Sequence, residues 1–253
     1  MDRLSTIKDM EEALLSLVYL RKDRMNRFLR WKNEMLPKII LHNSVSLDGS
    51  LTNFEPNMEL HYQIAGKYNA EAHLIGSNTV KAGVELYEED VSPEEEADFR
   101  KPERAENLPY WVIPDTRGVL EGLLHTCRRF EFCRDVIVLV SEETPAEYVR
   151  HLEERNYDHH IVGKIHVNLE RSLELLSEKY GIKTVSADTG RILGNLLLNQ
   201  GFVSEISLLV HPVIVGTTSY NMFSLANKNT KLELCKKETL EKDYVWLVYT
   251  VVP

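Results

Sequence analysis

Cysteine is scarce in this 253-residue chain, and long apolar runs are missing from it. Cys127, Cys133 and Cys235 form no Cys-x-x-Cys pair and leave one thiol over, which disfavours a disulfide framework and suits a reducing compartment. The apolar runs fall far below the roughly 20 residues of a membrane span. The acidic N-terminus "MDRLSTIKDMEEALL" lacks the apolar core of a signal peptide. We therefore expect a soluble, cytoplasmic protein without a membrane partner.

Positive charge is also in short supply. The 30 Lys and Arg residues face 39 Asp and Glu residues, which gives a formal net charge of −9. This excess of acid argues against a general nucleic-acid binder, although it permits a local basic pocket. The nine histidines include no His-Glu-x-x-His pair, and we expect no metal site. A Gly-x-Ser-x-Gly nucleophile elbow is missing too, which disfavours a serine hydrolase.

The N-terminal segment differs from the rest of the chain. Between residues 4 and 35, apolar residues recur at steps of three and four among charged ones, which predicts a helix or helical hairpin. We expect a helical extension over residues 1–36 and one main domain over residues 37–253. The apolar stripe must pack either on that domain or on a partner subunit. We favour the partner subunit, and therefore a homodimer.

From residue 38 onward, β-branched apolar runs alternate with amphipathic helical patterns. The predicted strands open the segments 38–50, 72–80, 110–118, 135–140, 182–187, 205–216 and 244–252. The predicted helices cover about 145–152, 169–180 and 191–200. This order predicts an α/β fold with a largely parallel sheet, in which the last strand pairs antiparallel at an edge.

Three local features complete the predicted organisation. Thr144 and Glu147 have the spacing of a capping box around Pro145, at the start of a helix. Residues 87–109 are acidic and contain three prolines, which indicates a long surface excursion within the domain. The segment "HTCRRFEFC", residues 125–133, could bind an anion, but an exposed loop is the favoured interpretation.

Small or acidic residues follow several predicted strands at the point where each ends. Ligands of open α/β sheets bind outside the carboxyl ends of the strands, so we expect these residues to converge on one cleft. They are Ser44, Asp48, Gly76, Thr79, Ser141 and residues 188–190. Asp48 and Asp188 are the carboxylates expected to face the cleft, unless each only caps a turn or a helix.

The stretch "SADTGRILGNLL", residues 186–197, places Gly190 directly before an apolar helical run. A glycine turn at a helix N-terminus exposes N–H groups in a positive potential, which suits a phosphate, and Arg191 could add a charge. The alternative is a plain turn between strand and helix. The stretch matches neither Gly-x-Gly-x-x-Gly nor a P-loop, so both interpretations stay open.

Three stretches together, "SVSLDGSLT", "LIGSNTVKAG" and "DTGRILGNLLLNQGFVSEISLLVHPVIVG", resemble the reductase family of riboflavin biosynthesis, and "VIPDTRG" fits it too. This is the domain that follows the deaminase in RibD and stands alone in archaea. The resemblance runs from about Pro37 to the C-terminus. It implies a dihydrofolate-reductase-like fold, with a mixed, mostly parallel sheet flanked by helices, and a homodimer. It also implies NADPH-dependent reduction of a ribosylated aminopyrimidine 5′-phosphate, which opens the ribose to a ribityl chain.

The same resemblance implies roles for individual residues. Ser44 would meet the nicotinamide carboxamide, and Ser141 would lie near the adenosine. Asp188 stands where the family commonly has a glutamate that meets the substrate, and Asp48 belongs to the matching Ser-Leu-Asp-Gly turn. The residues implied around the pyrophosphate are Gly76, Thr79, Val80, nearby Gly83, and the helix start Gly190, Arg191, Ile192 and Leu193.

The chain departs from the family pattern at the substrate half of the site. The common Glu-Gly-Gly-Gly is replaced by residues 188–191, which leaves less room for backbone approach, and Arg191 either binds phosphate or blocks it. Gly83 replaces a frequent acidic residue, and residues 54–73 lack the arginines that help hold substrate. The first hypothesis is an NADPH-dependent reductase of the riboflavin precursor or a related pterin-like or flavin-like small molecule. The second is a non-catalytic nucleotide-binding or scaffolding homologue.

Overall fold

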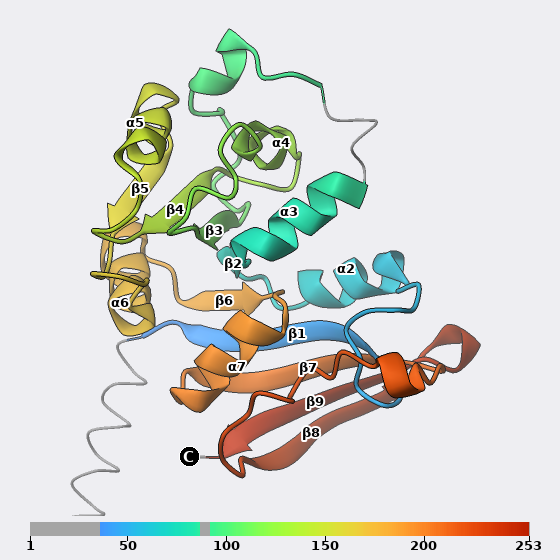
Figure 1. The fold of residues 1–253 in the computed structure, drawn as a ribbon. Helices are drawn as coiled ribbons and strands as arrows, with labels where there is room; N and C mark the ends of the chain where they lie inside the picture. The colour runs from blue at the N-terminus through green and yellow to red at the C-terminus, as the bar shows by residue number, and fades with distance from the viewer. Residues whose placement is uncertain (1–35, 87–91, 253) are drawn as a thin grey trace, which may run out of the picture.

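The computed structural model describes residues 36–86 and 92–252, and the predicted N-terminal helix lies outside them. Strands and helices alternate through this part of the chain (Figure 1). The strands are β1 (Lys38–Ser46), β2 (Ala72–Leu74), β3 (Tyr110–Pro114), β4 (Val136–Val140), β5 (Asp158–Ile161), β6 (Thr184–Ala187), β7 (Val203–His211), β8 (Lys231–Thr239) and β9 (Val245–Val252). The α-helices are α2 (Met58–Gly66), α3 (Ser77–Leu86), α4 (Leu124–Arg129), α5 (Ala146–Glu154), α6 (Leu169–Tyr180) and α7 (Arg191–Asn199). The short 3-10 helices are η2 (Glu96–Phe99), η3 (Gly216–Thr218) and η4 (Glu241–Asp243).

Within the described residues the strands form one sheet in the order β5-β4-β3-β2-β6-β1-β7-β9-β8, which Figure 1 shows from the top of the view to the bottom. All neighbours from β5 to β7 pair in parallel, whereas β9 pairs antiparallel with β7 and β8. The predicted α/β fold with a largely parallel sheet is confirmed. Because β6 lies between β1 and β2, the carboxyl ends of these three strands lie side by side.

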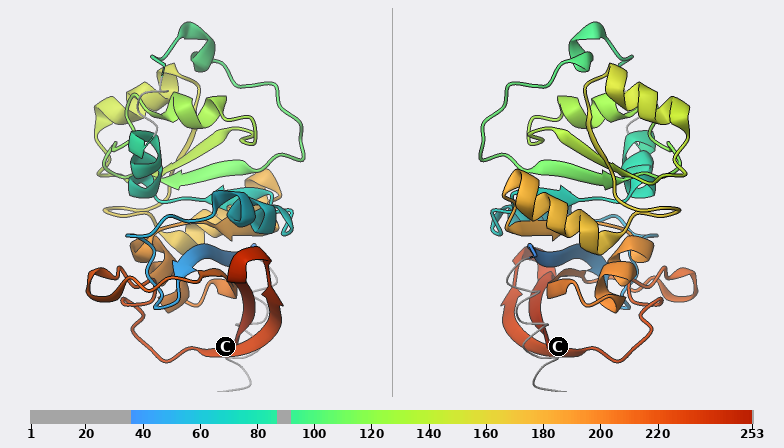
Figure 2. Two further views of the ribbon diagram at one scale, coloured as in Figure 1. Left: turned by 90° about the vertical axis from the view of Figure 1, so that its right-hand side faces the viewer. Right: turned by 90° about the vertical axis from the view of Figure 1, so that its left-hand side faces the viewer.

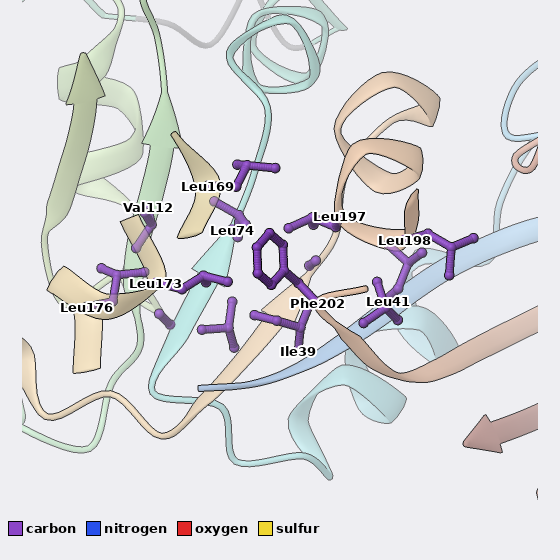
Figure 3. Close-up of a cluster of buried hydrophobic side chains, with 14 of the residues drawn as sticks. Ile39, Leu41, Leu74, Val112, Leu169, Leu173, Leu176, Leu197, Leu198 and Phe202 are labelled. Carbon is purple, nitrogen blue, oxygen red and sulfur yellow. The ribbon is translucent and has the colours of Figure 1, made fainter. Parts of the chain in front are cut away.

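Helices cover both faces of the twisted sheet, as Figure 2 shows in two views turned by 90° from that of Figure 1. On one face, α6 and α7 pack leucines such as Leu173 and Leu197 against β1, β2 and β6; Figure 3 shows this cluster, with Phe202 at its centre. On the other face, α3, α4 and α5 enclose β3 and β4. Helix α2 lies beside them and packs Ile64 on β7 and β9. Each such buried apolar side chain contributes about 1.5–3 kcal/mol.

The edge of the sheet differs from the prediction. The last strand, β9, does pair antiparallel, but the edge position belongs to β8, which the sequence pattern did not reveal. Strand β8 reads "KLELCKKET" and is mostly exposed, so it carries no clear apolar alternation. Lysines on an edge strand are a common protection against edge-to-edge pairing with other chains. No helix in the described ranges is long and apolar enough to cross a bilayer.

The predicted capping box before α5 is wrong. The helix begins at Ala146, with Pro145 in the N-cap position and no side-chain cap. The Thr144 hydroxyl instead accepts a hydrogen bond from the Ser141 N–H at 2.9 Å. The Thr144 hydroxyl therefore closes the turn after β4 and does not cap the N-terminus of α5.

The segment 125–133 is not the exposed loop that was predicted, since it contains most of α4. Arg128 is buried and donates from its Nε to Asp135 Oδ1 at 2.9 Å. The neighbouring Arg129 donates from its Nε to Asp98 Oδ1 at 2.8 Å, in the acidic excursion. The two arginines thus hold the protein's own carboxylates, and Arg129 fastens the described part of the excursion to the domain.

Candidate active site

A cavity of about 580 Å³ opens outside the carboxyl ends of β1, β2 and β6. This volume lies within the roughly 300–1,000 Å³ that is typical of small-molecule sites. Ser44 near the end of β1, Thr79 in α3 and Gly190 before α7 all line it, so the predicted shared cleft is confirmed. The other predicted site residues that line it are Gly76, Asp188, Arg191, Ile192 and Leu193.

Two cross-bonds hold the turn after β2 against the turn after β6. The Gly76 N–H donates to Thr189 Oγ1 at 3.2 Å, and the Gly190 N–H donates to Thr79 Oγ1 at 3.3 Å. A Cβ atom at Gly76 would come within 3.2 Å of Thr189 Oγ1, and one at Gly190 within 3.3 Å of Thr79 Oγ1. Glycine at both positions therefore lets the turns approach each other. The N-terminus of α7 stays open to the cavity, and its positive potential favours an anion there.

Arg191 lies at the first position of α7 and brings a cation to the same wall. Its guanidinium stacks on the Tyr220 ring at 3.7 Å, and its Nη1 donates to Ser224 Oγ at 3.1 Å. Its Nε is buried and has no partner among the described residues. The carboxamide oxygen of Asn43, another buried residue of the cavity wall, is likewise unpartnered. These two polar atoms suit a polar ligand, and the cation suits a negatively charged one.

Asp188, His61 and Ser44 form a hydrogen-bonded chain along the cavity wall. The Asp188 Oδ2 lies 3.0 Å from His61 Nε2, and the His61 Nδ1 lies 3.0 Å from Ser44 Oγ. Burial tends to raise the pKa of Asp188, but the hydrogen bond and charge of His61 outweigh it and hold that pKa below its ordinary value. About one third of the Asp188 side chain is exposed, so an ionised carboxylate faces the cavity.

A second layer of side chains fixes the position of His61. His42 Nε2 lies 3.2 Å from the His61 carbonyl oxygen, and His42 Nδ1 lies 2.9 Å from Ser207 Oγ. Trp246 Nε1 donates to the same hydroxyl at 3.0 Å. Burial, and then the charge of His61, lower the pKa of His42 from 6.5 to about 4, so His42 is neutral at pH 7. The sequence analysis missed His61 because it did not predict α2. The feature that could have pointed to it is a histidine in segment 54–73, where the arginines expected to hold substrate are missing.

Four predicted site residues do not line the cavity. Asp48 accepts hydrogen bonds from Ser46 Oγ at 2.6 Å and from the Val215 and Gly216 N–H groups at 3.1 and 2.9 Å. These bonds, the one from Ser46 foremost, lower its pKa to about 2. The structure therefore gives Asp48 the alternative role, fastening a turn to the loop after β7.

The remaining three are Val80, Gly83 and Ser141. Val80 is the buried residue of α3 and packs in the cluster around β3 and β4. Gly83 lies one helical turn further along α3, and an added Cβ atom there would meet open space. Ser141 is buried at the end of β4, with its hydroxyl 3.3 Å from that of Thr144. Their roles in cofactor binding stay predictions.

The family model described as the RibD C-terminal domain matches residues 37–246. A relative, the 2,5-diamino-6-ribosylamino-4(3H)-pyrimidinone 5′-phosphate reductase of Methanothermobacter thermautotrophicus, is 25% identical over 240 residues, which cover 86% of this chain and 99% of that protein. The family model spans the sheet from β1 to the start of β9, together with the flanking helices and the cavity described above.

Solved structures share the fold. A pyrimidine reductase-like protein from Corynebacterium diphtheriae aligns with a TM-score of 0.62 at 16% identity, covering 86% of this chain and 92% of that one. The riboflavin biosynthesis reductase Rib7 of Saccharomyces cerevisiae aligns with a TM-score of 0.58 at 17% identity, covering 86% and 91%. At these identities the two structures establish the fold alone. Because the family model spans most of its length, the chain belongs to the RibD C-terminal domain family.

Proposed function

We propose that this protein is an NADPH-dependent reductase of a ribosylaminopyrimidine 5′-phosphate. Its membership of the family and the activity named for the archaeal relative support the reaction class. The observation that carries the proposal is that a single cavity has two different walls, each suited to a different part of the reaction. One wall is a phosphate-suited helix start at Gly190 and Arg191, and the other is the carboxylate of Asp188 with its buried imidazole partner. The non-catalytic alternative is not favoured, since the relatives' names describe reductases.

The residues present fit a dinucleotide cofactor. The Gly76 and Gly190 turns approach closely, and a side chain at either glycine would crowd the wall. The start of α7 lines the cavity, where its N-terminal N–H groups suit a phosphate. Arg191 is paired with no carboxylate among the described residues, so its charge is available to a phosphate. Arg117, which is exposed and donates to the cavity residue Asn78 at 3.4 Å, offers a second cation that would favour NADPH over NADH.

A bound nicotinamide supplies the hydride, and the side chains of this chain orient the partners. Ser44 presents a hydroxyl to the cavity at the end of β1, where it would hold a carboxamide or substrate oxygen. Asp188 accepts hydrogen bonds from the hydroxyl or amino groups of the substrate. Arg191 replaces the arginines missing from residues 54–73 as a holder of a substrate or cofactor phosphate. Holding both reactants at one wall provides much of the rate through proximity.

We further propose that the protein works as a homodimer and that residues 1–36 form a helical extension at the subunit interface. The support is the apolar stripe in the sequence of that segment.

A turnover assay tests the proposed function. Purified protein is mixed with NADPH and the 2,5-diamino pyrimidinone substrate named for the archaeal relative. We expect loss of the reduced-nicotinamide absorbance only when both are present, together with formation of the ribityl product by mass spectrometry. The matched control is Asp188→Asn, which keeps the shape of the side chain and loses its charge. Cofactor oxidation at the same rate without the pyrimidine would contradict the proposal.

A further inference from the structure

The hydrogen-bond partners fix the proton positions in the chain from Trp246 to Asp188. His42 Nε2 faces a carbonyl oxygen, which only accepts, so this nitrogen carries the proton. His42 Nδ1 must then accept from Ser207 Oγ, whose oxygen accepts in turn from Trp246 Nε1. His42 is therefore a neutral ring held in one tautomer, and it fixes the backbone of His61 without exchanging a proton with it.

His61 differs from His42 because only one of its two nitrogens is fixed. Its Nε2 faces the ionised carboxylate of Asp188 at 3.0 Å, so Nε2 carries a proton in both charge states. Its Nδ1 faces the Ser44 hydroxyl at 3.0 Å, and a hydroxyl can donate or accept. Neutral His61 accepts from Ser44 at Nδ1. The imidazolium donates from Nδ1 to Ser44 Oγ, and the hydroxyl hydrogen of Ser44 then turns away from His61. The titrating proton is thus the one shared with Ser44.

We propose that Asp188, His61 and Ser44 form a proton relay whose exit into the cavity is the hydroxyl of Ser44. The proposal rests on the reductase function proposed above, because reduction by a hydride consumes one proton per turnover. The ribosylamine first opens: the bond from C1′ to the ring oxygen breaks, the amine N–H proton passes to that oxygen, and a C=N bond forms. As the carbon of this imine gains its hydride, the electron pair of the C=N bond moves to nitrogen. Ser44 Oγ–H delivers a proton to that nitrogen, and His61 Nδ1–H replaces it on Ser44. His61 is left neutral and regains a proton from solvent after product release.

The titratable groups around His61 are one carboxylate and three histidines. Asp188 is the carboxylate that faces it, while His42, His73 and His211 are the other titratable groups that act on it or are acted on by it. Burial lowers the pKa of all three of these histidines. His61 therefore faces one carboxylate and three rings that are neutral near pH 7. In this role Ser44 touches the ligand, and Asp188 steadies the charged form of His61.

The pH profile of kcat tests the relay. His61→Gln retains an N–H that can donate to Asp188 and removes the titrating proton. In the wild type we expect kcat to fall at alkaline pH as the imidazolium is lost. In His61→Gln we expect this limb to vanish and kcat near pH 7 to fall about 100-fold, the scale of general acid catalysis. The control is His166→Gln, at an exposed histidine that does not line the cavity, which should keep the wild-type profile. An unchanged limb and rate in His61→Gln would overturn the relay.

NMR of the full-length protein gives a second readout that needs no substrate. Long-range ¹H–¹⁵N correlations distinguish the two neutral tautomers of a histidine ring. We expect the proton of neutral His61 on Nε2, where it faces Asp188. In Ser44→Ala we expect neutral His61 to keep its proton on Nε2 while kcat falls as in His61→Gln. A neutral tautomer protonated at Nδ1 would overturn the relay. A wild type that reduces no pyrimidine would refute the proposed function instead. The position of the proton on neutral His61 would then be the test of the relay.

Discussion

Replacing Arg191 with glutamine separates the two roles that its position allows. Its guanidinium has a ring at 3.7 Å and one hydroxyl at 3.1 Å, but no carboxylate among the described residues. If Arg191 binds a cofactor phosphate, Arg191→Gln removes a charge-assisted hydrogen bond. If Arg191 blocks the wall, the shorter glutamine opens it.

A charge-assisted hydrogen bond contributes roughly 1.5–3 kcal/mol, and a factor of ten in affinity corresponds to about 1.4 kcal/mol. Arg191 is only partly buried, so the lower end of this range applies. We expect the Kd for NADPH to rise about 10- to 30-fold in Arg191→Gln. We also expect it to depend less steeply on salt concentration, because one attraction to phosphate is lost.

Isothermal titration calorimetry at two salt concentrations measures both effects. The matched control is Arg150→Gln, which removes the same charge from the exposed face of α5. This variant should bind NADPH like the wild type. A lower Kd in Arg191→Gln would show that the arginine blocks the wall, and an unchanged Kd would show that it does not meet the cofactor.

Three further predictions concern the turn at Gly190, the buried His42 and the N-terminal segment. Gly190→Val should raise the Kd for NADPH about tenfold or more, since its Cβ would lie 3.3 Å from Thr79 Oγ1 and its branches would crowd the phosphate approach; equal binding in calorimetry would refute this placement. The pKa of His42 is lowered to about 4, so the unfolded chain binds more protons and the free energy of unfolding should fall as the pH drops from 7 to 5. The loss assigned to His42 is about 2 kcal/mol, and His42→Gln should show a correspondingly smaller loss in urea titrations at the two pH values. A chain that starts at Met35 should form weaker dimers in light scattering and show a more concentration-dependent Tm, and an unchanged dimer at low concentration would contradict the interface role.

The fold was largely predictable because its strongest elements carry local signals. The continuous apolar run Val136–Val140 is buried on every residue, as expected for a parallel strand with neighbours on both sides. Helix α6 ends at Tyr180 and is capped by Gly181, which has a φ of 66°, a left-handed conformation that suits glycine. The elements that were missed depend on tertiary context. Strand β8 takes its place by pairing with β9, and its charged sequence shows no buried face.

The candidate site was predictable where backbone geometry decides it and unpredictable where long-range partners decide it. Gly190 and Thr79 converge because parallel strands end at one edge of the sheet. Two aspartates that look alike in sequence have opposite surroundings. Asp188 lies in the cavity beside His61, from which it is 127 positions away along the chain. Asp48 instead accepts hydrogen bonds from the N–H groups of a loop about 167 positions away along the chain. Spacing along the chain carries no information on such pairs.

Transfer of a label from the cofactor tests the central claim most directly, namely that this cavity brings a nicotinamide and a ribosylaminopyrimidine together. NADPH deuterated at one face of the nicotinamide C4 is incubated with the protein and the pyrimidinone 5′-phosphate, and the product is analysed by mass spectrometry and NMR. We predict one deuterium in the product, at the former ribose carbon that bears the ring amine, with label from one face of the cofactor only. Asp188→Asn and Gly190→Val should transfer it more slowly, to the same carbon. A product without deuterium, or label at any other carbon, would contradict the account.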